Sequence, residues 1–210
     1  MKIPIVPFIA LAVGFALTVN AAVLSPEQSA TITDENGDGI ADVVGVGFGH
    51  PGEPNYGTTL VQKGEGQFPY ERRTVEEFDL SNISVLQSAT LTFSFYNPSG
   101  SPASFTTLIT IGDGQIALSD FSSAATDLRA RTAAANGQSF ISYDITDWMN
   151  NAIAGGASFL TVRQQIVGTS GGSEVFSPQI SIAAVPEPAT GVLLICGLLS
   201  VLGWLKVNRA

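Results

Sequence analysis

The chain has 210 residues and a formal net charge of -9, and only 13% of its residues are charged. Its few Lys and Arg residues exclude a typical nucleic-acid partner, because phosphate binding needs clustered basic side chains, and a cation is the more natural counterpart. One cysteine and one histidine exclude an internal disulfide and a zinc site made of several Cys or His ligands. The length suits one domain once the two ends are set aside.

Residues 1–22 have the pattern of a secretory signal peptide. Lys2 precedes the apolar segment 5–19, and Asn20, Ala21 and Ala22 offer small residues for cleavage. A permanent N-terminal anchor is the alternative. The pattern predicts an exported chain whose folded domain covers residues 23–184.

The middle of the chain predicts short strands separated by Gly- and Pro-rich turns. The clearest strand is 89–96, where Leu91, Phe93 and Phe95 alternate with Thr and Ser. Residues 97–100 form a turn, so 89–96 and 105–111 are predicted to pair as a hairpin. The other predicted strands are 23–33 (an edge strand), 40–48, 58–63, 72–80, 139–143, 159–166 and 175–183.

One helix is predicted after residue 143. Asp144 can cap it, Ile145, Trp148 and Met149 share an apolar face, and the pair of glycines at 155–156 ends it. We expect Trp148 to be buried together with Phe78 and the apolar side chains of 89–96. Residues 119–135 leave open whether a second short helix forms around 126–133.

These elements indicate a mainly β protein, a jelly-roll-like antiparallel β-sandwich with one short helix. The expected flanking elements are an N-terminal signal helix and a C-terminal transmembrane helix. The segments that resemble the strand and helix pattern of jelly-roll domains called DNRLRE-type are 72–83, 88–91, 143–148, 155–156 and 159–160. That resemblance implies a location at the cell surface more than it implies an activity.

The segment 185–210 predicts an extended entry, a membrane span and a basic stop. Pro186 and Pro188 keep the entry around Glu187 extended. The uncharged segment that follows would be about 25 Å long as a helix, slightly short of a hydrocarbon core of about 30 Å. A buried C-terminal helix is the alternative. The span includes Gly191, Leu193, Leu198 and Trp204, and Lys206 and Arg209 follow it.

The order Pro186-Glu187-Pro188, short span and basic end resembles the PEP-CTERM sorting signal of exopolysaccharide-producing bacteria. The resemblance covers only this tail. It implies recognition by exosortase, a membrane protease-transpeptidase, while the chain is transiently held in the inner membrane. The resemblance also implies delivery to the cell surface or extracellular matrix of a Gram-negative bacterium, in association with exopolysaccharide.

A candidate calcium site lies early in the domain. Asp34, Asn36, Asp38 and Asp42 have the spacing of a calcium loop, and Gly39 permits its sharp turn. The bidentate Glu of an EF-hand would fall on Gly45, so the loop looks more like the short calcium loops of extracellular repeats. The alternative is an Asx-rich turn that binds nothing.

No residue set marks a catalytic centre in the sequence. His50 is read as a loop histidine, and Glu76 and Glu77 as structural carboxylates and not a glycosidase pair. Tyr96, Tyr143 and Trp148 can stack on a sugar ring, although Trp148 is expected in the core. The sequence therefore predicts an exported, non-catalytic surface or matrix protein; the alternatives are a carbohydrate-binding module and, with least support, a glycan-cleaving enzyme.

Overall fold

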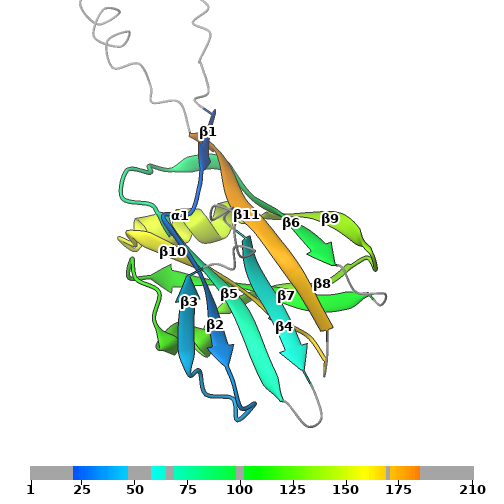
Figure 1. Cartoon of the computed structure of the whole chain (residues 1–210). Coiled ribbons are helices and arrows are strands. Elements are labelled where there is room, and N and C mark those ends of the chain that lie inside the picture. The colour runs from blue at the N-terminus through cyan, green and yellow to red at the C-terminus, as the bar shows by residue number, and fades with distance from the viewer. Residues whose placement is uncertain (1–20, 47–57, 65–68, 98–101, 169–170, 185–210) are drawn as a thin grey trace, which may run out of the picture. The chain divides into compact units, whose positions relative to one another are not determined.

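Antiparallel strands make up most of the computed structural model, which describes residues 21–46, 58–64, 69–97, 102–168 and 171–184 (Figure 1). All of these residues belong to one unit, Ala21–Val185. The elements are β1 (Ala21–Leu24), β2 (Gln28–Asp34), β3 (Val43–Val46), β4 (Thr58–Gly64), β5 (Tyr70–Asp79), β6 (Leu86–Asn97), β7 (Ala103–Gly112), the 3-10 helix η1 (Leu118–Phe121), β8 (Thr126–Ala133), β9 (Gly137–Asp144), α1 (Thr146–Ala154), β10 (Phe159–Ile166) and β11 (Gly171–Ala184).

The strands form two layers, and hydrogen bonds connect these layers into one continuous sheet. The first layer has the order β3-β2-β5-β10-β7-β8. In the second layer β11 is central: β4 and β1 pair with different parts of one edge of β11, β6 pairs with its other edge, and β9 pairs with the far edge of β6. The layers join at β5, because β2 pairs along one edge while β10 and β4 divide the other edge between them. The result is the antiparallel sandwich that the sequence predicts.

Aromatic side chains fill the space between the layers. Phe93 and Phe95 from β6 meet Phe105 from β7, with ring centroids 6.5 and 3.7 Å apart respectively. The predicted hairpin of 89–96 with 105–111 is therefore wrong, since β6 pairs with β9 and β11 while β7 pairs with β8 and β10. The two strands lie in opposite layers, and the apolar stripes of both point into the same core.

One further expectation is wrong, and one question that the sequence leaves open is answered. Residues 23–33 are not one edge strand, because the strand is interrupted around Pro26 and its second part, β2, lies between β3 and β5. A proline cannot donate a hydrogen bond to a strand ladder, which explains the break. Residues 126–133 form strand β8 and not a helix.

The helix α1 packs against the edge of the core. Asp144 accepts a hydrogen bond from the Thr146 amide at 3.0 Å, and the Asn150 side chain exchanges two hydrogen bonds with the Leu86 backbone. Met149 is fully buried, but Trp148 is only half-buried at the rim of the core, so the prediction that it is buried is wrong in degree.

The predicted signal peptide, residues 1–22, lies outside the described residues except for Ala21 and Ala22, which begin β1, and the predicted sorting signal, residues 185–210, lies wholly outside them. Among the helices that the structure does describe, none has the length and apolar content needed to span a membrane.

Candidate functional site

The outward face of strands β6 and β9 carries polar hydroxyls and two exposed aromatic rings. Strand alternation places every second side chain in the core and leaves the others in solvent. We call this the hydroxyl–aromatic face and define it by its outward residues Thr90, Thr92, Ser94 and Tyr96 on β6 and Gln138, Phe140, Ser142 and Asp144 on β9.

Tyr96 and Phe140 form the aromatic part of this face. Their side chains are 42% and 74% exposed. In the antiparallel register Phe140 lies opposite Ser94, and Tyr96 lies opposite Gln138. The two rings are therefore diagonal neighbours on one surface, roughly 7 to 8 Å apart at the backbone and within reach of a shared ligand.

The hydroxyl part of the face continues along the same two strands. Thr92 Oγ1 and Ser142 Oγ lie 3.0 Å apart across the strand pair, and Thr90 lies opposite Asp144. The row extends onto β11, where Gln179 is opposite Thr92 and is exposed. Hydroxyl groups donate and accept hydrogen bonds, so this row can contact a ligand that carries many hydroxyls of its own.

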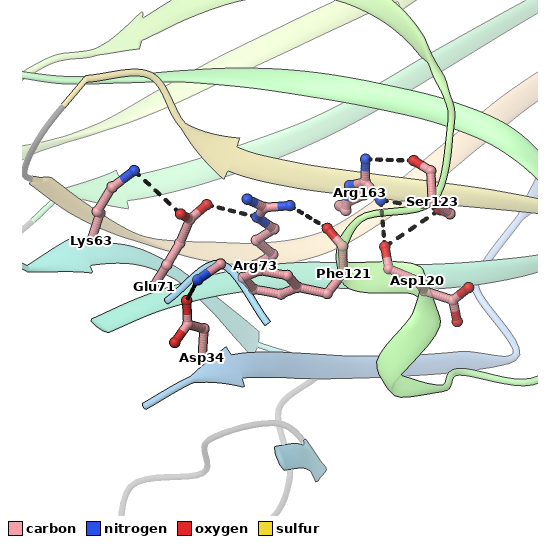
Figure 2. Close-up of polar contacts among 9 residues, drawn as sticks. Asp34, Lys63, Glu71, Arg73, Asp120, Phe121, Ser123 and Arg163 are labelled. Carbon is pink, nitrogen blue, oxygen red and sulfur yellow. Dashed lines mark hydrogen bonds and ion pairs between the residues drawn. The ribbon is translucent and has the colours of Figure 1, made fainter. Parts of the chain in front are cut away.

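The opposite outward face, that of the first layer, is covered by the chain itself. The 113–123 segment links β7 to β8 in the chain, and its 3-10 helix η1 lies against β2 and β5. Figure 1 shows the sheet that it lies on. Arg73 donates a hydrogen bond to the Phe121 carbonyl, and its guanidinium lies 3.8 Å from the Phe121 ring centroid. Arg163 donates to the carbonyls of Asp120 and Ser123 (Figure 2).

These arginines belong to a row of charged side chains in which Arg163 is buried and Arg73 partly buried under the 113–123 segment. Figure 2 shows Glu71 between Lys63 and Arg73, and Glu71 forms an ion pair with each of them, at 3.3 Å to Lys63 and 2.6 Å to Arg73. Burial, and next the nearby positive charge of Arg73, lower the pKa of Arg163 to about 10. Arg163 remains charged at neutral pH. Its hydrogen bonds fix the segment to the sheet.

Glu76 and Glu77 are both buried, and they lie on opposite faces of β5. Glu76 is opposite the core residue Val162, while Glu77 accepts a hydrogen bond from the Thr161 hydroxyl under the 113–123 segment. Burial raises the pKa of Glu77 above its ordinary value of 4.5. The two carboxyl groups cannot flank one sugar bond, because a sheet separates them, so they do not form a glycosidase pair.

The predicted calcium residues lie on one loop, but their oxygens bind the loop's own backbone. Asp34 accepts hydrogen bonds from the amides of Gly37 at 2.6 Å and Gly39 at 2.8 Å. Asn36 accepts from the Asp38 amide at 2.9 Å, and the Asp42 carboxylate accepts from the Glu35 amide at 2.8 Å. Within the described ranges, no three His, Cys, Asp or Glu side chains are grouped as metal ligands, and calcium binding stays a prediction.

The remaining predicted site residues fall into two groups. His50 and every predicted residue of the tail from Pro186 to Arg209 lie outside the described residues. Tyr143 is buried, with its hydroxyl bonded to the Arg129 carbonyl at 3.1 Å, so among the three candidate stacking rings only Tyr96 lies on an open face. Sequence reasoning missed Phe140, although alternation with the inward residues Ile141 and Tyr143 indicates its direction.

No family model matches the chain, and no curated protein matches it. Several solved structures are similar in fold. The "xylan-binding module CBM15" has 14% identity and a TM-score of 0.47 over 80% of this chain and 99% of that chain. The K3 cleaved adhesin domain of Lys-gingipain from Porphyromonas gingivalis has 13% identity and a TM-score of 0.42 over 77% and 99%.

A third similar structure is "CBM35 from Cellvibrio japonicus Abf62", with 13% identity and a TM-score of 0.34 over 79% of this chain and 99% of that chain. The identities and TM-scores of all three are low. The function proposed below therefore rests on the chain's own residues.

Proposed function

We propose that the protein is an exported, non-catalytic β-sandwich that binds polysaccharide on its hydroxyl–aromatic face. The diagonal pair of exposed rings, Tyr96 and Phe140, carries the proposal. Full burial of a Phe side chain is worth about 1.5 to 3 kcal/mol, so a Phe that is 74% exposed leaves most of that free energy available to a ligand. A single exposed apolar residue is ordinary on a protein surface, but two aromatic rings on one sheet face favour a binding site.

The chemistry of the hydroxyl–aromatic face matches both the apolar surface and the hydroxyl groups of a sugar. A pyranose ring has an apolar C–H surface, which can lie on the negative face of an aromatic ring, and a rim of hydroxyl groups. Next to the rings, Thr92, Ser142 and Ser94 can exchange hydrogen bonds with that rim. A ligand with one apolar face and many hydroxyls satisfies both parts of the surface.

The location of the protein is part of the same proposal. The 1–22 segment directs export, and the 185–210 tail is sorted by exosortase and removed, as its resemblance to PEP-CTERM signals implies. An exported protein with an open glycan-binding face would meet the polysaccharide outside the cell. The face favours glycan binding over a purely structural role in the matrix.

The proposal contains no catalytic step. The neighbouring carboxyl groups of Glu76 and Glu77 are buried on opposite sides of a strand. On the hydroxyl–aromatic face Asp144 lies opposite Thr90, and on the adjoining strand Glu174 lies opposite Tyr96, about 20 Å further along β6. Glycoside hydrolysis generally needs two carboxyl groups about 5 to 10 Å apart across the scissile bond. The face is built to hold a sugar and not to cleave one.

A glycan array with the purified protein tests this function. We expect binding to a set of polysaccharides, and loss of about tenfold or more in affinity in Tyr96→Ala and in Phe140→Ala, as for central interface aromatics. Ile40→Ala is the matched control, because Ile40 is 68% exposed but lies outside the face. Equal binding by all three variants would place the site elsewhere, and no binding by wild-type protein would refute the function.

A further inference from the structure

We infer that the ligand of the hydroxyl–aromatic face is an uncharged polysaccharide, an inference that rests on the proposed function and names its ligand class. Glycans outside a cell include both neutral polymers and polymers rich in carboxylate. The two classes place opposite demands on a binding surface, because a carboxylate polymer needs cationic partners. The charges of the second layer decide between them.

The three long strands of the second layer, β6, β9 and β11, contain no Lys or Arg. Asp144 is the one charged residue among the eight that define the hydroxyl–aromatic face, and Glu174 lies opposite Tyr96 on the adjoining strand β11. The described basic residues are Lys63, Arg72, Arg73, Arg129, Arg131 and Arg163, which lie on β4, β5, β8 and β10. The whole chain has a net charge of -9, so a polyanion would be repelled as it approached.

Most of the basic residues elsewhere are engaged within the fold, and the exception, Arg129, is exposed on β8. Arg73 and Arg163 hold the 113–123 segment against the first layer, and Lys63 pairs with Glu71. Arg131 lies over the Tyr143 ring, with 5.5 Å from its guanidinium carbon to the ring centroid. The cations that a carboxylate polymer would require therefore lie on strands other than β6, β9 and β11, and most of them are occupied within the fold.

The same face does not suit a second protein molecule. Stable protein interfaces have an apolar centre and bury roughly 800 Å² on each partner. Here the two aromatic rings are bordered by Ser94, Ser142 and Gln138, whose polar groups would lose water without assured partners. A sugar polymer supplies hydroxyls to each of these groups, and it lays consecutive rings on the Tyr96–Phe140 diagonal.

Affinity electrophoresis with matched polymers tests the charge argument. Hydroxyethylcellulose and carboxymethylcellulose share a backbone and differ in charge, as do methyl-esterified and de-esterified polygalacturonan. We expect retardation by at least one neutral member, with the same mobility at low and high salt, and none by its anionic partner. Phe140→Ala should reduce the retardation about tenfold.

Gln138→Lys adds one cation beside Tyr96, and Gln138→Met is the matched uncharged control. We expect the Lys variant alone to gain salt-sensitive retention on the anionic polymers; no gain would contradict the charge argument. Preferential binding of wild-type protein to the anionic members would overturn the ligand class and leave the proposed function standing. If the wild-type protein binds no polymer in electrophoresis and none on the glycan array, both the ligand class and the proposed function are overturned. A wild-type dimer that binds no glycan and that dissociates in Phe140→Ala would overturn both as well.

Discussion

Replacing Phe93 by alanine tests whether the aromatic core holds the two layers together. Phe93 is 2% exposed, and its ring lies 4.9 Å from Phe95, 6.5 Å from Phe105 and 5.9 Å from Tyr143 by ring centroids. A buried Phe→Ala change costs about 3 to 5 kcal/mol. The rings around Phe93 come from both layers and are held by separate strand ladders, so the space cannot close fully, and the upper part of that range is expected.

Thermal and denaturant unfolding of the purified protein measure this cost. For a domain of about 160 residues, each kcal/mol lowers the melting temperature by about 2 to 4 °C, which gives a loss of about 10 °C or more for Phe93→Ala. Phe140→Ala is the matched control, since it removes the same side chain from the exposed face of the neighbouring strand. Its effect on unfolding should stay within about 0.5 kcal/mol.

Two results would refute the reasoning. A loss below about 1 kcal/mol in Phe93→Ala would mean that the ring is not enclosed by both layers. A loss in Phe140→Ala as large as that in Phe93→Ala would mean that the strand register is shifted by one residue, because such a shift exchanges the inward and outward faces.

Three other predictions concern the pH response, the calcium loop and the tail. Burial raises the pKa of Glu77, so its contribution to the free energy of unfolding is fully present below about pH 4.5 and is lost as the pH rises through the raised pKa. Glu77→Gln should flatten this pH dependence and melt at a higher temperature than wild type at neutral pH. Identical pH profiles for the two proteins would contradict the prediction. Calcium should raise the melting temperature of wild type but not of Asp38→Ala; no shift, or equal shifts, would identify the loop as a turn only. Mass spectrometry of exported protein should find no peptides from residues 191–205, and changing Glu187 should leave uncleaved chain in the inner membrane; recovery of those peptides outside the cell would contradict removal of the tail.

The strands could be predicted from sequence because their side chains alternate. Residues 159–166 were predicted as a strand and form β10, and the predicted strands 58–63 and 89–96 lie within β4 and β6. Their pairing could not be predicted, because two apolar stripes joined by a short loop fit either a hairpin or two facing layers. In the structure, Phe95 and Phe105 meet from the two facing layers.

The candidate site was predicted in part. The sequence predicts Tyr96 as a possible stacking residue but not Phe140, because a strand of only five residues, 139–143, gives a weak signal of which side chains point outward. The cover on the first layer also could not be predicted, since Arg73 and Arg163 meet a segment that is 40 or more residues away in the chain. Only the fold shows that the first layer is covered and the hydroxyl–aromatic face is open.

Backbone amide chemical-shift mapping during titration with a bound polysaccharide tests the central claim most directly. The account predicts shifts at residues 90–96 and 138–144, and none at the 34–42 loop or the 113–123 segment. Phe140→Ala should abolish those shifts at the same glycan concentration. Shifts concentrated on the 113–123 segment or the 34–42 loop, with 90–96 and 138–144 unmoved, would contradict the account.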